Sequence, residues 1–134
     1  LADAGNIVVT VGGGGIPVVK DENGYLKGME AVIDKDLAAA MLAKDLNADM
    51  FVISTAVPKV CLNYGKSDEK KLDSITTEEA REYIKEGHFA PGSMLPKIQA
   101  LVDFVDSTGN MGIVTDPEHL YDAVYGDQGT KIQN

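Results

Sequence analysis

The sequence has 134 residues, enough for one domain with a hydrophobic core, and its 44% hydrophobic and 25% charged residues are ordinary for a globular protein. The formal net charge of −9 argues against general binding to nucleic acid or to an anionic membrane surface. No apolar run is long enough to cross a bilayer, and no signal peptide is visible. We therefore expect neither a nucleic-acid nor a membrane partner.

The first part of the chain predicts a strand, a glycine-rich loop and a hairpin. Residues 6–11 (NIVVTV) form a short, mostly β-branched run, which is typical of a buried strand. Four glycines follow (Gly12, Gly13, Gly14 and Gly15), where the backbone either approaches a ligand closely or simply turns. Their spacing matches neither the dinucleotide fingerprint nor a P-loop. Residues 21–24 are predicted to be a hairpin tip between strands at 18–19 and 25–26.

The middle of the chain predicts a helix and two strands. The helix spans residues 36–46, and its apolar stripe is expected to face the core. That stripe consists of Leu37, Met41, Leu42 and Leu46. A buried strand at 50–54, a loop at 55–59 and a third strand at 60–64 follow.

The last part of the chain carries clearer helix signals. Thr76 and Glu79 have the spacing of a capping box, which opens a helix that stops at Gly87. Ser93 is expected to cap a helix that runs to about residue 105. A strand at 111–115, a short helix from 117 to 126 and an edge strand at 130–132 complete the chain. Because strands alternate with helices, we predict an α/β fold with a mostly parallel sheet covered by helices on both faces.

The cysteine count and the absence of repeats indicate where the chain is located and how many domains it has. The single cysteine, Cys61, cannot form an internal disulfide, so a reducing, cytoplasmic compartment is expected. Residues 1–134 contain no repeat and no internal linker, and we expect one domain. The chain begins at Leu1 in what reads as the end of a helix, which suggests a piece of a longer polypeptide.

Two lysines near predicted helix starts are the leading candidates for binding an anion. Ligands of open α/β sheets collect at the carboxyl ends of strands, where loops 12–15 and 55–59 are expected to lie. Lys35 and Lys97 each fall in or near the first turn of a helix. If the two helix starts converge, backbone N–H groups and both ammonium groups would clamp a polyphosphate. If they do not converge, both lysines simply face solvent, and the spacing leaves the two alternatives open.

The remaining polar candidates have structural explanations of comparable weight. Asp34 and Asp36 either cap the helix or hold Mg²⁺ jointly with phosphate oxygens, and the metal ligands are not identified by the sequence. His88 lies just past a helix end, where an interaction with the last carbonyls is expected. Cys61 sits between apolar residues and reads as a small buried hydrophobe rather than a nucleophile.

Several segments together resemble the carboxyl-terminal part of carbamate kinases, within the amino acid kinase superfamily. They are GGGGIPV (12–18), EAVIDKDLA (30–38), TAV (55–57), NYGK (63–66), GHFAPGSMLPK (87–97) and GTKI (129–132). The combination of the second and fifth segments is specific, whereas the glycine run alone is not. The resemblance covers nearly the whole chain and implies the amino-acid-kinase fold.

The resemblance also implies an activity and a set of residues. The activity is reversible phosphoryl transfer between ATP and carbamate with Mg²⁺, in which carbamoyl phosphate and ADP give ATP during arginine catabolism. Lys35 and Lys97 would contact phosphates, and Asp36 would orient or support the lysines and the metal. The glycine run would lie near the transferred group, and a homodimer is implied. The residues that would border the nucleotide are Ala56, Val57, Tyr64, Met94 and Pro96.

Members of the family that the chain resembles are much longer than 134 residues. The part absent here carries further glycine loops and much of the carbamate site, so we expect a nucleotide-binding portion with little or no turnover alone. Pro58 stands where many relatives have an acidic residue. Two alternatives stay open: a non-catalytic nucleotide-binding or regulatory module of the same fold, and a superfamily kinase for another small acceptor.

Overall fold

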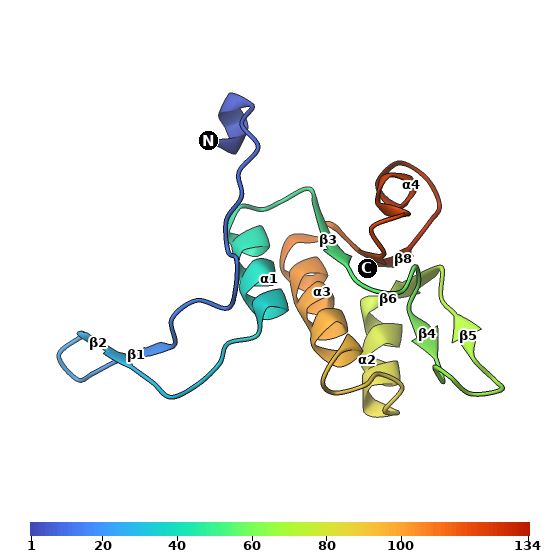
Figure 1. The fold of residues 1–134 in the computed structure, drawn as a ribbon, viewed down its shortest axis with the longest axis horizontal. Coiled ribbons are helices and arrows are strands. Elements are labelled where there is room, and N and C mark those ends of the chain that lie inside the picture. The colour runs from blue at the N-terminus through green and yellow to red at the C-terminus, as the bar shows by residue number, and fades with distance from the viewer.

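A four-stranded mixed sheet forms the centre of the computed structural model, which describes all of residues 1–134 (Figure 1). The strand order is β3 (Met50–Ser54), β7 (Met111–Thr115), β8 (Thr130–Gln133) and β6 (Ser74–Thr76). The β3–β7 and β6–β8 pairs are parallel, and the β7–β8 pair is antiparallel. The predicted α/β class is confirmed, and the predominance of parallel pairing holds for two of the three pairs.

Helices cover both faces of this sheet, as predicted. The helices α1 (Lys35–Asp45), α2 (Thr77–Lys85) and α3 (Met94–Thr108) pack on one face, and α4 (Leu120–Tyr125) contacts β7. Gly112 of β7 faces α3, because a Cβ atom placed there would lie 2.8 Å from Leu101 Cδ2. Gly129, which precedes β8, faces Ala123 of α4 and Ile113 of β7 instead. The short helix therefore lies on the opposite face (Figure 1).

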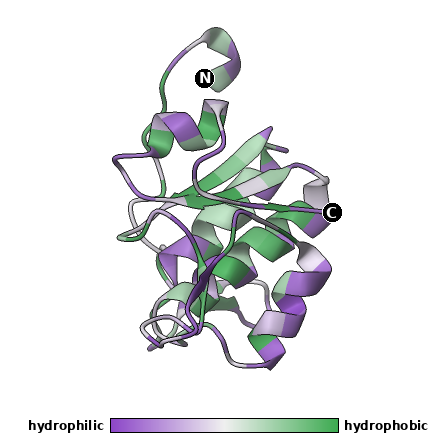
Figure 2. Ribbon diagram, turned by 90° about the vertical axis from the view of Figure 1, so that its right-hand side faces the viewer, coloured by the Kyte–Doolittle hydropathy of each residue, from purple (hydrophilic) through white to green (hydrophobic).

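The hydrophobic core lies between the sheet and the three helices of the first face. It is built from α3 residues such as Ile98 and Phe104 and from strand residues such as Val114 and Ile132, all of which are fully buried. Figure 2 shows hydrophobic residues concentrated on the strands and on α3, while α2 carries more polar residues outward. No helix is long and apolar enough to traverse a bilayer.

Two small antiparallel hairpins extend from this core. The pair β1 (Val18–Lys20) and β2 (Leu26–Gly28) confirms the predicted hairpin, with Asp21 accepting hydrogen bonds from the Asn23 and Tyr25 amides across the tip. The pair β4 (Cys61–Leu62) and β5 (Lys70–Lys71) replaces the longer strand predicted at 60–64. A 3₁₀ turn (Ala2–Ala4) precedes all of them.

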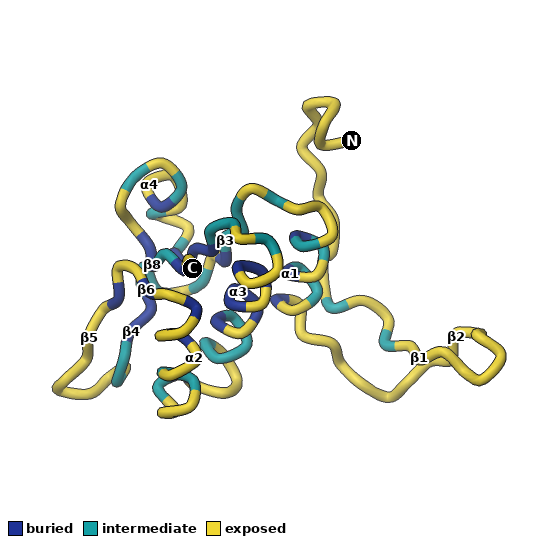
Figure 3. The backbone as a smooth tube through the Cα atoms, turned by 180° about the vertical axis from the view of Figure 1, so that it is seen from behind, coloured by how far each residue is buried: buried dark blue, intermediate teal, exposed yellow.

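The prediction of a buried strand at 6–11 was wrong. Ile7 is 98% exposed and Val9 is 97% exposed, and the segment pairs with no strand (Figure 3). A strand buries its apolar side chains only when neighbouring strands and helices cover them, and nothing within residues 1–134 covers this segment. The edge of β3 that does not pair with β7 is likewise without a neighbouring strand.

The assignment of the apolar stripe of α1 to the core was also wrong. The buried side of α1 carries Asp36, Ala40 and Ala43, whereas Leu37 and Met41 are 44% and 58% exposed. Small residues let α1 pack closely against α3, and this close contact decides which side is buried. Figure 3 shows α1 with its buried residues turned toward α3.

Two further local predictions need correction. Ser93 makes no side-chain hydrogen bond at the start of α3, because the Leu95 amide donates to the Ala90 carbonyl and the next residue, Pro96, has no N–H to donate. The segment at 130–132 is not an edge strand, since β8 pairs with β7 on one side and with β6 on the other. By contrast, the capping box between Thr76 and Glu79 is confirmed in full.

Candidate nucleotide site

The start of α1 is fixed by a cap that presents Lys35 and Asp36. The Asp34 carboxylate accepts hydrogen bonds from the backbone amides of Asp36 and Leu37, so Asp34 acts as the N-cap. With the first turn held in this way, the next two side chains are set on the end of the helix that faces α3. Asp36 is only 8% exposed.

The Asp36 carboxylate joins the two lysines predicted to bind phosphate. Lys35 Nζ donates to Asp36 Oδ1 at 2.7 Å, and Lys97 Nζ donates to Asp36 Oδ2 at 2.7 Å. Nearer the carboxyl ends of both helices, Lys44 of α1 forms an ion pair with Asp103 of α3. These two contacts mean that α1 and α3 run side by side in the same direction, and their amino-terminal turns lie at one end. The convergence that the sequence left open is therefore present.

The charges of this cluster stabilise one another. Burial by itself raises the pKa of Asp36, but the hydrogen bonds from Lys35 and Lys97 outweigh it and hold the pKa of that carboxyl below its ordinary value. The hydrogen bond to Asp36 raises the pKa of Lys35. The two ammonium groups balance the carboxylates of Asp36 and the Asp34 cap, so the partial positive charge of the two helix starts is what makes this a favourable place for an anion.

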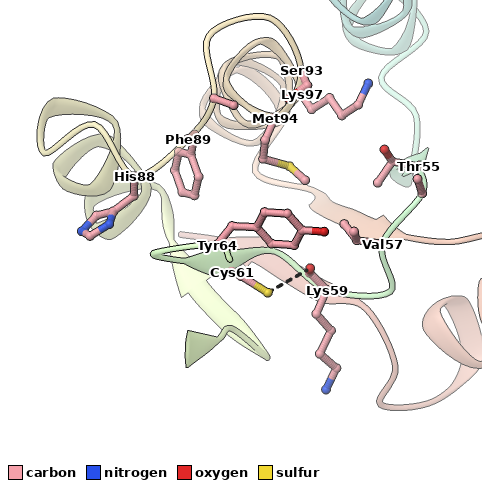
Figure 4. Close-up of a pocket in the computed structure, with 12 residues that line it drawn as sticks. Thr55, Val57, Lys59, Cys61, Tyr64, His88, Phe89, Ser93, Met94 and Lys97 are labelled. Carbon is pink, nitrogen blue, oxygen red and sulfur yellow. Dashed lines mark hydrogen bonds between the residues drawn. The ribbon is translucent and has the colours of Figure 1, made fainter. Parts of the chain in front are cut away.

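An apolar cavity of about 210 Å³ opens beside Lys97 (Figure 4). It lies between the loop after β3, the hairpin β4–β5 and the start of α3. In Figure 4, the Met94 side chain lies above the Tyr64 ring, and the ring extends toward Val57. The lining residues are Thr55, Ala56, Val57, Lys59, Cys61, Tyr64, His88, Phe89, Ala90, Ser93, Met94 and Lys97. An apolar slot with a lysine at its rim suits a flat ring joined to an anionic group.

Four of the five residues predicted to border a nucleotide line this cavity: Ala56, Val57, Tyr64 and Met94. Pro96 does not line it; it lies in the first turn of α3, where the missing N–H of proline costs no helical hydrogen bond.

The glycine run lies apart from the cavity. Residues 12–15 line a separate open hollow against the outer side of α1, with Met41 and Leu42. Gly14 approaches the chain just before the Lys35 helix, where a Cβ atom would sit 1.8 Å from the Ile33 carbonyl oxygen. The structure therefore brings the two lysines and the cavity together, and it leaves the run on the other side of α1.

Several cavity residues were not predicted as site residues. Phe89 is 4% exposed and follows the helix end at Gly87, and an aromatic residue directly after a helix stop was the available signal. His88 points its ring at Tyr83 and its Nε2 at the Glu86 carboxylate, 3.1 Å away, rather than at helix carbonyls. Cys61 is buried as predicted, and burial raises the pKa of its thiol, with the Glu69 charge adding to the effect.

The residues here do not fit a metal held by protein ligands alone. Both oxygens of Asp36 are engaged by lysines, and an oxygen of Asp34 caps the helix. The structure contains no group of three or more histidine, cysteine, aspartate or glutamate side chains arranged to hold an ion. A hard cation at this place would have to be bound mainly by phosphate oxygens and water.

The chain belongs to the amino acid kinase family, whose family model matches residues 1–116. The relatives that it matches include carbamate kinases and carbamate kinase-like proteins. It is 50% identical to the carbamate kinase of Trichomonas vaginalis over 98% of this chain and 42% of that protein. It is 48% identical to the carbamate kinase-like protein YqeA of Escherichia coli over 98% of this chain and 43% of that protein.

A solved structure supports the same relationship. Carbamate kinase from Giardia lamblia bound to AMP-PNP superimposes with a TM-score of 0.85 at 47% identity, covering 90% of this chain and 42% of that one. The chain thus spans less than half the length of the curated relatives that it matches.

Proposed function

We propose that this chain is the nucleotide-binding domain of a longer carbamate kinase, which transfers a phosphoryl group reversibly between ATP and carbamate. The observation that carries the proposal is the joining of Lys35 and Lys97 by Asp36 at the mouth of the Tyr64–Met94 cavity. Support also comes from the relatives named carbamate kinase and from the AMP-PNP bound to one of them.

In this proposal the cavity takes the base and the lysines take the phosphates. The apolar ring faces would pack between Tyr64 and Met94, leaving the phosphate chain to run past Lys97 toward Lys35. Phosphoryl transfer depends mainly on positioning and on neutralising charge, and two ammonium groups at two helix starts supply both. Asp36 keeps the two lysines at a fixed separation. Mg²⁺ would arrive with the nucleotide and stay on its phosphate oxygens.

The remaining parts of the proposal concern the longer protein. The glycine run would approach the transferred group once the rest of the kinase is present. We place the protein in the cytoplasm, in arginine catabolism, and as a homodimer, all on the resemblance to carbamate kinases. Neither nucleic acid nor membrane is expected as a partner, in line with the net charge of −9.

The 134-residue chain alone is expected to bind ADP without turning over. Isothermal titration with ADP should give a saturable heat, while a luciferase assay with carbamoyl phosphate and ADP should give ATP only at the background rate. A polypeptide of the relatives' length that contains this chain should form ATP. ATP formation by the 134-residue chain at that polypeptide's rate would overturn the assignment of this chain as an incomplete half.

The same assay separates the two alternatives. YqeA is named as carbamate kinase-like, so a related protein without this activity is a specific possibility to test. A full-length protein that binds ADP but forms no ATP from carbamoyl phosphate would be a non-catalytic module. One that forms ATP only from another acyl phosphate would be a kinase for a different acceptor.

A further inference from the structure

The segment GTKI at 129–132 has no place in the site described so far. None of its residues lines the cavity or contacts the lysine cluster. Yet Thr130 is fully buried, and Gly129 before it has φ 79° and so little room that a Cβ atom would lie 2.8 Å from the Val114 carbonyl oxygen. The chain is therefore held tightly at the point where Thr130 begins β8.

The Thr130 hydroxyl connects two segments of the cavity wall. We define the wall hairpin as residues 59–72, which carry Lys59, Cys61 and Tyr64 of the cavity lining. The Val60 amide donates to Thr130 Oγ1 at 2.9 Å, and Thr130 Oγ1 donates to the Leu72 carbonyl oxygen. The Leu72 amide in turn donates to the Val60 carbonyl oxygen at 2.9 Å.

This arrangement is an interrupted strand pair. The register of β4 and β5 places Cys61 opposite Lys71, so Val60 lies opposite Leu72. In a regular antiparallel pair the two residues would exchange both hydrogen bonds directly. Here one bond is direct, and the other is relayed through the hydroxyl of a residue 70 positions away in the sequence. The hydroxyl therefore lies between the two strands on one side of the pair.

We infer that Thr130 is a positioning residue for the nucleotide cavity, acting through the Val60 and Leu72 backbone to place Cys61 and Tyr64. The inference rests on the proposed function only for the identity of the ligand. Val60 is fully buried and Leu72 is 5% exposed, so water does not readily replace the hydroxyl. A side chain without a hydroxyl must leave both backbone groups unpaired or let them close on each other. Either result moves the wall.

Two substitutions and one control separate positioning from plain stability. Thr130→Val keeps the shape and removes the hydroxyl, whereas Thr130→Ser keeps the hydroxyl. Ile75→Val is the control, because Ile75 is buried in the same sheet and does not line the cavity. The measurements are the rate of Cys61 alkylation by N-ethylmaleimide, the dissociation constant for ADP and the unfolding free energy in urea.

Thr130→Val should label Cys61 faster than its loss of stability accounts for, and it should bind ADP about tenfold more weakly, because both hydrogen bonds of the hydroxyl that position the wall hairpin are lost. Thr130→Ser should restore both values. Ile75→Val should change labelling only by the factor that its own loss of stability predicts. The inference fails if the labelling rate of Thr130→Val rises only as far as its loss of unfolding free energy predicts, as for Ile75→Val. It also fails if Thr130→Ser labels as fast and binds ADP as weakly as Thr130→Val.

The experiment distinguishes a failure of the proposed function from a failure of the role assigned to Thr130. If the unsubstituted chain binds no ADP, the proposed function fails, while the labelling rates still decide the role of Thr130. If Thr130→Val does not fold, hydrogen exchange of the Val60 amide in the unsubstituted chain decides instead. That amide should exchange as slowly as the amides of β7, and exchange as fast as that of an exposed loop would overturn the inference.

Discussion

At the scale of single residues, Asp36 determines how the site is charged. Its carboxylate is 8% exposed and receives hydrogen bonds from two ammonium groups, one on its own helix and one on α3. The sequence named Lys35 and Lys97 because each lies near a predicted helix start, and the role of Asp36 came from the resemblance to carbamate kinases. The sequence could not show the contact itself, since 61 positions separate Asp36 from Lys97 and only the packing of α1 on α3 closes that distance.

The lowered pKa of Asp36 predicts a specific acid sensitivity. The pKa of Asp36 is lower in the folded chain than the value of about 3.9 for aspartate in an unfolded chain. Its carboxylate therefore stabilises the fold fully at pH values above the unfolded pKa, and this contribution is lost as the pH falls through the folded pKa. Asp36→Asn should therefore be less stable than the unsubstituted chain at pH 7, and the gap should narrow toward pH 3. Urea titrations across this range test it, and a gap of constant size would contradict the assignment.

The reactivity of the Cys61 thiol can report on access to the cavity, because Cys61 lines it. Burial raises the pKa of its thiol, so the reactive thiolate is scarce at neutral pH. Alkylation by N-ethylmaleimide, followed by mass spectrometry, should be slower than that of free glutathione at pH 7.5 and should still be rising above pH 9. Saturating ADP should slow it further, because Cys61 lines the cavity. A rate equal to that of glutathione, unaffected by ADP, would argue against this placement.

At the scale of elements, most of the local signals were read correctly, whereas the prediction of which side of α1 is buried was wrong. The Thr76–Glu79 capping box and the 21–24 hairpin tip depend on neighbouring residues, and both form as predicted. The side of α1 that is buried is decided by its contact with α3, and hydrophobic periodicity carries no information on that partner. The alanine side of the helix is buried against α3, while Leu37 and Met41 stay exposed. The Ser93 cap is a local signal that failed, because the Leu95 amide donates to the Ala90 carbonyl and not to the Ser93 side chain.

The position of α3 against the sheet predicts the effect of one glycine substitution. A Cβ atom at Gly112 would meet Leu101 Cδ2 at 2.8 Å and Val105 Cγ2 at 3.4 Å, both buried. Gly112→Ala should therefore destabilise the fold by about 1–3 kcal/mol, the usual cost of overfilling a core. It should also weaken ADP binding, because α3 carries Met94 and Lys97 of the cavity.

The matched control is Gly92→Ala, at an exposed position where no atom lies within 4 Å of the added methyl group. Urea unfolding of both variants makes the comparison. Equal stabilities for the two would mean that α3 does not pack on β7 as closely as described.

At the scale of the whole molecule, the sheet and its helices form a core from which residues 1–33 extend (Figure 1). The run at 6–11, the outer side of α1 and the open edge of β3 together leave apolar and unpaired backbone surface uncovered. The residues at 6–11 are mostly β-branched, and this composition suits a strand. A strand is buried only where neighbouring strands or helices cover it, and no element within residues 1–134 covers the segment 6–11.

This exposed surface predicts how the chain behaves in solution. Anilinonaphthalene sulfonate, a dye that fluoresces on exposed apolar surface, should bind the folded chain more strongly than a compact protein of the same size. Replacing Ile7 and Val9 with threonine should reduce the fluorescence without lowering the unfolding free energy, because both side chains are almost fully exposed. A marked loss of stability in that variant would mean that the segment is packed.

The central claim is that Lys97 and Lys35, held together by Asp36, form the phosphate end of the site. The most direct measurement is the dissociation constant for ADP of Lys97→Met beside that of Lys66→Met, which removes an exposed lysine outside the cavity lining. Loss of a charge-assisted hydrogen bond, worth about 1.5–3 kcal/mol, should weaken ADP binding by roughly 10- to 100-fold in the first variant and leave the second unchanged. Equal ADP affinities for Lys97→Met and the unsubstituted chain would contradict the account.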